Sequence, residues 1–264
     1  GAMKTRVGLI GAGDISDWHA RAVRQAGMEV TAVSARTGST RLKDFAARHN
    51  ISRVTEDWRK MLECPEDWDG LLIASRTHVI PQILEAAMEL NVPILVEKPV
   101  AVTSDVLNRL IQKAHPKVMV GYNRRYYDPV RFARDFVRSA GPLIGHMSLP
   151  DSISPGAASG DGRPYLHRFF ENSCHGIDLL RHMFGDLEVE SVRRIKTNHD
   201  RIAGFAAILT NTRADVIQLS ANWGAPANFS LTLDRPDRRV ELKPFEIATV
   251  YEGMDVVDPT DETP

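Results

Sequence analysis

The sequence predicts an α/β domain built on a parallel sheet, followed by an α+β domain with an open, mostly antiparallel sheet. Residues 3–121 alternate short apolar runs with amphipathic stretches, which is the pattern of repeated strand–helix–strand units. From Val189 onward, alternating apolar and polar runs are broken by turn-forming residues such as Pro226 and Pro236, which is typical of antiparallel strands. We therefore expect two domains, residues 3–121 and residues 122–264.

The first domain follows element by element from its apolar pattern. Pro81 fits the first turn of a helix, where a missing N–H costs nothing. Short apolar runs predict strands at Val7–Ile10, Val30–Ser34, Leu71–Ala74, Ile94–Val96 and Val118–Gly121. Amphipathic stretches predict helices at Asp17–Ala26, Leu42–His49, Pro81–Leu90 and Ser104–Ala114.

The second domain begins with a helix and ends in strands. Asp151–Arg163 is rich in Gly, Pro, Ser and Asp, which predicts a long loop that is either a lid over a substrate or slack chain. The C-terminal residues 255–264 are polar, and we expect them to be frayed. The expected helices are Val130–Ser139 and Phe169–Phe184, the second ended by Gly185, and the expected strands are Ile144–Leu149, Ala203–Leu209, Ala214–Ala221 and Phe229–Asp234.

The composition favours a small soluble ligand as the partner. The formal net charge is -1, and no run of Lys or Arg suggests binding to nucleic acid or to an anionic membrane. No segment approaches the roughly 20 apolar residues of a membrane span. Cys64 and Cys174 lie far apart, which argues against a disulfide framework and predicts a reducing, cytoplasmic location. Gly1 and Ala2 precede Met3 like a cloning remnant, and no signal region follows.

A glycine-rich turn follows the first expected strand and precedes the first expected helix. In this GxGxxS element Gly11 permits a tight turn, Gly13 lets the backbone approach a pyrophosphate, and Ser16 is small enough for close helix packing. The helix start offers unpaired N–H groups to that anion. The context predicts a Rossmann domain that binds a dinucleotide through Gly11, Ala12, Gly13, Asp14 and Ile15. The alternative is a plain strand-to-helix turn.

The end of the second strand favours NADP over NAD. An NAD site normally carries an acidic residue here for the ribose 2′-hydroxyl, but the stretch contains Ser34, Arg36 and Thr37 without a carboxylate. A guanidinium flanked by hydroxyls suits a 2′-phosphate. The alternative is that Arg36 stacks over the adenine and the chain accepts either cofactor.

Four motifs in order give the chain a family resemblance. The motifs are the Glu-Lys-Pro of Glu97–Pro99, the loop Ile73–His78, the segment Gly121–Tyr126 and the helical stretch Glu171–Asp178. Together with the glycine turn they resemble the glucose-fructose oxidoreductase and inositol dehydrogenase (Gfo/Idh/MocA) family. The resemblance implies a sugar or polyol oxidoreductase whose cofactor site also includes Ser75, Arg76, His78, Glu97, Lys98 and Asn123.

The resemblance places catalysis on Lys98 and His175. A histidine can accept a hydroxyl proton near neutral pH, and a lysine can stabilise the developing alkoxide. Glu171, His175 and Asp178 fall at i, i+4 and i+7, on one helical face. The family usually has aspartate where Glu171 stands, so this longer side chain either orients the histidine or is a solvated acid of the first helical turn. The alternative for His175 is a core histidine bonded to a carbonyl.

Other chemistries have weaker support in the sequence. His175, Asp178 and His182 share a helical stripe, but hydride transfer needs no metal and no further ligands stand out, so we expect no metal site. Neighbours on a helix point about 100° apart, which disfavours Cys174 and His175 as a nucleophilic pair. The candidates to line a substrate cleft are Arg124, Arg125, Tyr126, Tyr165, His167 and Arg168. Several arginines there would suit an anionic sugar, unless they are surface residues.

The expected function is an NADP-dependent sugar or polyol dehydrogenase. The alternatives are a nucleotide-sensing protein without catalysis, and a reductase of a non-sugar carbonyl or imine. The chain is short for the family, with strands that we expect to stop near Met254, so it is either trimmed or truncated. An open sheet with few covering elements predicts a homodimer or homotetramer formed through the C-terminal sheet.

Overall fold

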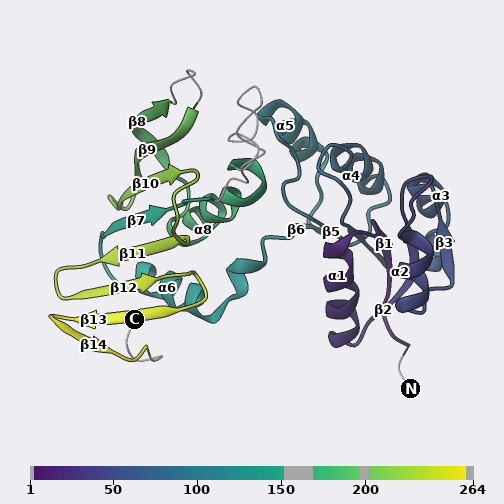
Figure 1. Cartoon of the computed structure of the whole chain (residues 1–264), viewed down its shortest axis with the longest axis horizontal. Coiled ribbons are helices and arrows are strands. Elements are labelled where there is room, and N and C mark those ends of the chain that lie inside the picture. Colours follow the sequence, from purple (N-terminus) through teal and green to yellow (C-terminus); the bar gives the residue numbers. More distant parts are fainter. Residues whose placement is uncertain (1–2, 152–168, 197–201, 260–264) are drawn as a thin grey trace. The chain divides into compact units, whose positions relative to one another are not determined.

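The computed structural model describes residues 3–151, 169–196 and 202–259. The chain divides into two compact units, residues 1–121 and residues 122–264 (Figure 1).

The first unit is built on a six-stranded sheet of order β3-β2-β1-β4-β5-β6. All of its neighbouring strands are parallel. The order reverses between β1 and β4, which is where an open α/β sheet binds its ligand. The strands are β1 (Arg6–Ile10), β2 (Glu29–Ser34), β3 (Arg53–Thr55), β4 (Gly70–Ile73), β5 (Ile94–Val96) and β6 (Val118–Val120).

Helices cover both faces of this sheet because successive strand residues point to opposite sides. Leu9 and Val33 belong to a core shared with α1 and α2, whereas Ile10 and Ala32 belong to a second core shared with α3, α4 and α5. The helical elements are α1 (Asp14–Gln25), α2 (Leu42–Arg48), α3 (Trp58–Leu62), the 3-10 turn η1 (Pro65–Asp67), α4 (Ile80–Met88) and α5 (Ser104–Lys113). The α/β fold with a parallel sheet is confirmed.

The sequence interpretation missed two neighbouring elements of the first unit, β3 and α3. Strand β3 contains a single apolar residue, Val54, so it forms no apolar run, and helix α3 has only five residues, which is too few to show a period. Helix α1 begins at Asp14, three residues earlier than expected, because Gly13 is its N-cap.

The second unit is built on an eight-stranded sheet of order β14-β13-β12-β11-β7-β10-β9-β8. Its neighbours are antiparallel except β7 and β10, which are parallel. This mostly antiparallel sheet is also as expected. The strands are β7 (Ile144–Ser148), β8 (Glu188–Lys196), β9 (Ile202–Thr210), β10 (Val216–Asn222), β11 (Ser230–Asp234), β12 (Arg238–Leu242), β13 (Ala248–Glu252) and β14 (Asp255–Val257).

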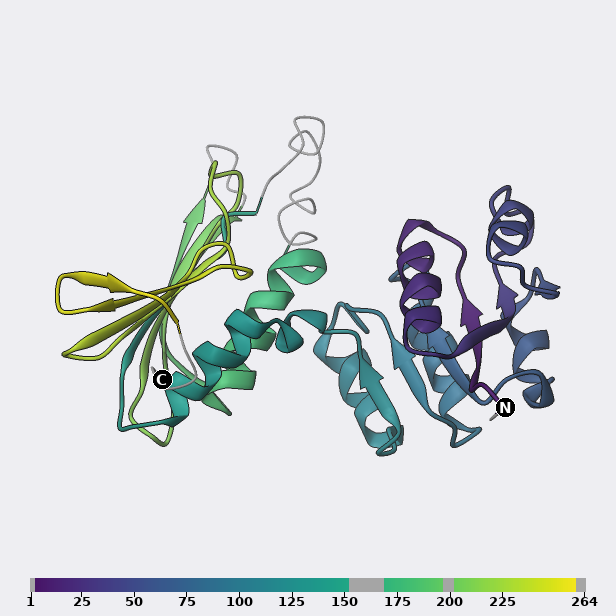
Figure 2. The ribbon, with the colours of Figure 1, turned by 90° about the horizontal axis from the view of Figure 1, so that it is seen from below.

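Helices α6 and α8 lie on one face of this sheet (Figure 2). Phe136 of α6 and Leu179 of α8 pack with Ile217 and Leu231 of the sheet in one buried core. The helical elements are the 3-10 turn η2 (Asn123–Tyr126), α6 (Asp128–Arg138), the π-helical turn η4 (Phe169–Ser173) and α8 (Cys174–Phe184).

Two expectations about the second unit were wrong. The sheet does not stop near Met254, and residues 255–257 are not frayed, because β14 pairs with β13 through Val250 and Val257. The strand expected from Ala214 begins at Val216, since Ala214 occupies a turn with a φ of 65°. The expected loop lies outside the described residues from position 152 onward. Within the described ranges, no helix has the length and hydropathy to cross a membrane.

Candidate functional site

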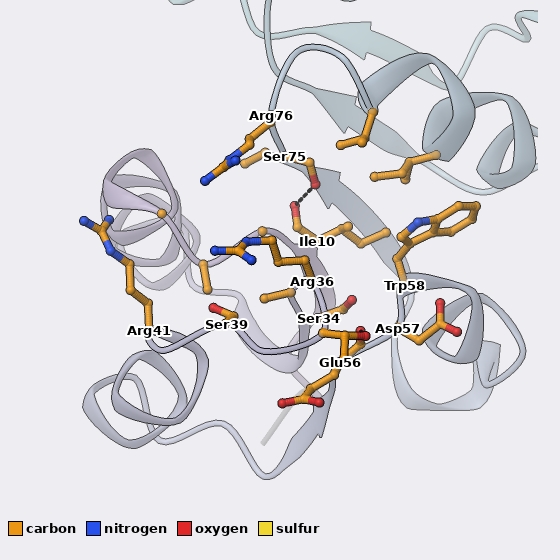
Figure 3. Close-up of a pocket in the computed structure, with 18 of the residues that line it drawn as sticks. Ile10, Ser34, Arg36, Ser39, Arg41, Glu56, Asp57, Trp58, Ser75 and Arg76 are labelled. Atoms are coloured by element: carbon orange, nitrogen blue, oxygen red, sulfur yellow. Dashed lines mark hydrogen bonds between the residues drawn. The ribbon is translucent and has the colours of Figure 1, made fainter.

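A pocket of about 690 Å³ lies at the carboxyl ends of β1, β2 and β4 (Figure 3). Ile10 ends β1, Ser34 ends β2 and Ala74 directly follows β4, so the carboxyl ends of three parallel strands meet at this pocket. The expected cofactor residues that line this pocket are Gly11, Ala12, Gly13, Ser34, Arg36, Thr37, Ser75, Arg76 and His78.

The two glycines of the turn have different structural reasons. Gly11 has a φ of 121°, and a Cβ there would lie 2.3 Å from the carbonyl oxygen of Ala74. Only glycine fits this position. Gly13 has a φ of -84° and a ψ of -174°, and no atom lies within 4 Å of the place of its Cβ. No side chain caps α1 at Gly13, so the start of the helix is open to an anion. The turn therefore fits the pyrophosphate of a dinucleotide.

Two loops bring polar groups to the pocket. Ser75 donates its hydroxyl hydrogen bond to the carbonyl of Ile10 at 3.2 Å, which holds the loop after β4 against β1. Figure 3 shows Arg76 extending from this loop and Arg36 from the end of β2. Both arginines are exposed, whereas Ser34 is buried. The arrangement leaves two cations at the mouth of the pocket, where they can meet a phosphate.

The sequence interpretation missed two segments that line the pocket, residues 39–41 and residues 56–59. Trp58 lies under the guanidinium of Arg59, with 4.3 Å from the guanidinium carbon to the ring centre, and Asp57 caps α3 by accepting the N–H of Arg59 at 2.9 Å. Arg41, which also lines the pocket, pairs with the exposed Asp14 at 2.8 Å. The missed lining residues are Ser39, Thr40, Arg41, Glu56, Asp57, Trp58 and Arg59. Asp57 directly before Trp58 is a helix-start signal in the sequence, which could have predicted α3 and the lining segment 56–59.

Several expected cofactor residues lie outside the pocket lining. Asp14 and Ile15 are exposed on the first turn of α1, and Asn123 is exposed on η2 in the second unit. Lys98 is partly buried directly after β5. Glu97 is bound to His19 of α1, with 2.6 Å between Oε1 and Nε2.

Helix α8 places His175 and Asp178 in the buried part of the second unit. Their exposed fractions are 6% and 9%, while Glu171 on the preceding π-helical turn is partly exposed. The ring of Tyr122 meets the ring of His175 edge-on, with 6.0 Å between the centroids. Burial, followed by the neighbouring Cys174 and Asp178, raises the pKa of Tyr122 and keeps its hydroxyl protonated. The candidate base thus has an aromatic, neutral neighbour.

The structure brings Asp178 and Arg125 together. Nε of Arg125 lies 2.7 Å from Oδ2 of Asp178, and a second, shorter bond joins the other nitrogen and oxygen. The hydrogen bond with Asp178 raises the pKa of Arg125. Of the other expected substrate residues, Arg124 stacks over Phe229 at 5.7 Å, Tyr126 is 56% exposed, and Tyr165 lies outside the described residues together with His167 and Arg168.

His182 continues the stripe of α8 but has a different environment. Burial is the main cause that lowers the pKa of His182, and the positive charge of the nearby Arg125 lowers it further. It lines a second pocket of about 360 Å³ with Arg125 and Asp178. In the described parts of the chain, no group of three His, Cys, Asp or Glu side chains could hold a metal ion.

Comparison with known proteins gives a family match for the first unit. Residues 5–122 match the model of an oxidoreductase family with an NAD-binding Rossmann fold. Inositol 2-dehydrogenase of Acidothermus cellulolyticus is 29% identical over 237 residues, which are 83% of this chain and 67% of that protein. The rhizopine catabolism protein MocA of Rhizobium meliloti is 30% identical over 213 residues, 75% of this chain and 62% of that protein. The chain thus spans about two thirds of these relatives.

Solved structures share the fold over nearly the whole chain. An inositol dehydrogenase homologue from Azotobacter vinelandii, complexed with NAD+, superimposes with a TM-score of 0.80 at 15% identity, covering 97% of this chain and 76% of that chain. An oxidoreductase from Agrobacterium radiobacter, complexed with NAD+, L-tartaric acid and magnesium, gives 0.80 at 17% identity, covering 97% and 79%. At these identities the likeness concerns the fold.

Proposed function

We propose that this chain, whose residues 5–122 match the model of an oxidoreductase family with an NAD-binding Rossmann fold, transfers a hydride between NAD(P) and a carbinol carbon of a sugar-like polyol. The observation that carries the proposal is the pocket at the ends of β1, β2 and β4, with Gly13 open at the start of α1. The pocket residues fit a dinucleotide, whose nicotinamide, when bound, supplies or accepts the hydride.

NADP is the proposed cofactor, with NAD as the alternative. The pocket has the exposed guanidinium of Arg36 beside the hydroxyls of Ser34 and Thr37. Arg41, which the sequence interpretation did not include, adds a second guanidinium to this wall. Cationic and hydroxyl donors favour a 2′-phosphate over a bare ribose. The carboxylates of Glu56 and Asp57 lie on the same pocket and leave a ribose hydroxyl as an alternative ligand.

The proton chemistry is proposed for His175 and Lys98. In the oxidation, His175 takes the hydroxyl proton of the substrate while the carbinol C–H bond breaks and its electron pair leaves with the hydride. The C–O bond becomes a carbonyl, so charge and electrons balance. Lys98 hydrogen-bonds the developing alkoxide and stabilises its charge. Glu171 is proposed to orient His175 or to accept a substrate hydroxyl.

A neutral polyol is favoured over an anionic sugar as the substrate. The anionic preference depended on free arginines, but Arg125 is committed to Asp178 and Arg124 is stacked over Phe229. Relatives named inositol 2-dehydrogenase fit the same substrate class.

Calorimetric titration with NADP(H) and NAD(H), followed by a panel of inositols, sugars and nucleotide sugars monitored by nicotinamide absorbance, tests the proposal. We expect NADP(H) binding and turnover of at least one cyclic polyol. Lys98→Ala and His175→Ala should each remove turnover and retain cofactor binding. Tight binding without turnover of any panel member would favour a nucleotide-sensing protein, and turnover of carbonyls or imines alone would favour a non-sugar reductase.

Assembly through the sheet of the second unit is proposed as well. A groove of about 500 Å³ crosses the face opposite α6 and α8, and Ser191, Ile208 and Thr232 are among its lining residues. A second copy would cover this face. Light scattering after size exclusion should give a dimer or tetramer, and Ile208→Lys should shift it toward the monomer. A clean monomer for the wild-type chain would overturn this proposal.

A further inference from the structure

The carboxylate of Glu97 connects helix α1 to Lys98, the residue proposed to bind the developing alkoxide. Its Oε1 lies 2.6 Å from Nε2 of His19, and its Oε2 accepts the backbone N–H of Lys98 at 3.1 Å. The side chains of His19 and Glu97 are only 17% and 14% exposed. One carboxylate therefore serves the cofactor helix with one oxygen and the amide of Lys98 with the other.

The sheet holds Glu97 in this place. Its N–H donates to the carbonyl of Ile73 at 2.8 Å, which continues the pairing of β4 and β5 beyond the last residue of β5. On the other side lies Gly121, directly after β6, and a Cβ there would be 3.6 Å from the carboxyl group of Glu97. The backbone at Glu97 is thus held between its two neighbouring strands. The hydrogen bond of His19 with Glu97 and that of Glu97 with the N–H of Lys98 connect α1 to Lys98, so a shift of α1 acts on Lys98 through them.

We propose that Glu97 and His19 are positioning residues, whose bond sets the place of Lys98 relative to the glycine turn at the start of α1. The inference rests on the proposed function, because these two places must be in register only if the cofactor held by α1 reacts with an oxygen bound by Lys98. Hydride transfer is sensitive to misplacement of about 1 Å, which can cost on the order of 100-fold in rate. The pair itself moves no proton and no electron.

The chemistry of the pair supplies a conservative replacement. In Glu97→Gln the amide oxygen can still accept the N–H of Lys98, while the amide NH₂ can donate to His19 in its other tautomer. Glu97→Ala loses both bonds. If Glu97 only filled space, Glu97→Gln and Glu97→Ala would differ in stability, because their side chains differ in volume. If Glu97 positions Lys98, the two variants differ in kcat.

The test measures kcat, KM, the nucleotide Kd by calorimetry, and amide hydrogen exchange of residues 97–101. For Glu97→Ala and His19→Ala we expect kcat to fall at least about tenfold, while the nucleotide Kd changes less than about threefold. Exchange at residues 97–101 should become faster in both variants, and nucleotide should protect this segment only in the wild type and in Glu97→Gln. Glu97→Gln should keep kcat within about threefold of the wild type.

The chain offers a matched control on the same helix. Nε2 of His49 lies 2.6 Å from Oδ1 of Asp17 on α1, and these side chains are 8% and 22% exposed. His49→Ala removes an equally short histidine–carboxylate bond from α1 without touching the Lys98 segment. It should leave kcat and the exchange of residues 97–101 unchanged. An equal loss of kcat in His49→Ala and His19→Ala, or equal losses in Glu97→Gln and Glu97→Ala, would overturn the inference.

The exchange measurement separates this inference from the proposed function. If the wild type binds nucleotide but turns over no substrate, the dehydrogenase proposal fails. Hydrogen exchange then still tests whether the bond of His19 with Glu97 holds the Lys98 segment in place. Faster exchange at residues 97–101 in His19→Ala, and not in His49→Ala, would then support it. Unchanged exchange in His19→Ala would overturn the positioning role whatever the activity of the wild type.

Discussion

Arg125 and Asp178 hold each other through two parallel hydrogen bonds, one of them 2.7 Å long, although 53 positions separate them in the sequence. The pair ties the turn η2 to helix α8. The carboxylate of Asp178 is 8% exposed and the guanidinium of Arg125 is 38% exposed. This geometry commits both carboxylate oxygens of Asp178 to the guanidinium of Arg125.

Asp178→Ala should lower the free energy of unfolding by about 2 kcal/mol, because removal of one partner leaves a partly buried charge unpaired and solvent screens the exposed part. Chemical denaturation measures it. Asp186→Ala is the control, since its pair with Arg181 is exposed on both sides. That variant should unfold like the wild type. Equal losses in the two variants would show that burial of the Arg125 pair contributes nothing.

Gly11→Ala and Gly13→Ala should fail in different ways. The Cβ in Gly11→Ala meets the carbonyl of Ala74 in a backbone of positive φ, so the variant should lose about 2 kcal/mol of stability or more. Gly13→Ala has open space and an ordinary backbone, so it should fold normally but weaken NADP binding about tenfold or more by blocking the approach of the pyrophosphate. Thermal unfolding and calorimetry measure the two effects. Unchanged affinity in Gly13→Ala would contradict the assigned anion site.

Arg36→Ala should weaken NADP binding about tenfold or more and NAD binding much less, because only NADP carries a 2′-phosphate for the guanidinium. Titrations with both nucleotides measure the ratio. Arg53→Ala is the control, since Arg53 is exposed and absent from the pocket lining. Equal losses of NADP and NAD affinity in Arg36→Ala would remove the 2′-phosphate assignment.

Asp17 should contribute stability that disappears in acid. The hydrogen bond from His49 is the main cause that lowers the pKa of Asp17 below its ordinary value of 3.8, and a hydrogen bond from Arg48 makes a smaller contribution. The folded state therefore binds fewer protons than the unfolded state, so the stabilisation is complete above the ordinary pKa and is lost as the pH falls through the folded pKa. Asp17→Asn should reduce the free energy of unfolding by about 1 kcal/mol at pH 6, with a shrinking difference toward pH 3. Denaturation at both values measures it, and an equal loss at both would contradict the mechanism.

Local patterns made the glycine-rich turn of the pocket predictable. The turn around Gly11 and Gly13 depends on backbone conformations of neighbouring residues, and a strand before it with a helix after it is visible in the sequence. The two sheets and their strand directions followed from apolar periodicity in the same way. Relations over few residues were thus accessible without the structure.

Contacts between distant residues were not predictable. The partnership of Arg125 and Asp178 depends on how η2 packs against α8, and the bond of Glu97 to His19 depends on α1 lying against the end of β5. Arg125, Asp178 and Glu97 were assigned separately to substrate, catalysis and cofactor because nothing in the sequence connects them to their partners. His19 was given no role. The pocket segment around Trp58 was missed for another reason, since helix α3 is too short to show a period.

The parallel partnership of β7 with β10 has a consequence for the order of folding. Strand β7 lies in the middle of its sheet, between β10 and β11, although those strands are made more than 60 residues later in the chain. During synthesis on the ribosome, Met147 therefore has no strand partner until Leu219 and Leu231 have emerged. Closing such a long loop is slow, so this half of the polypeptide is where chaperones would be expected to bind the nascent chain.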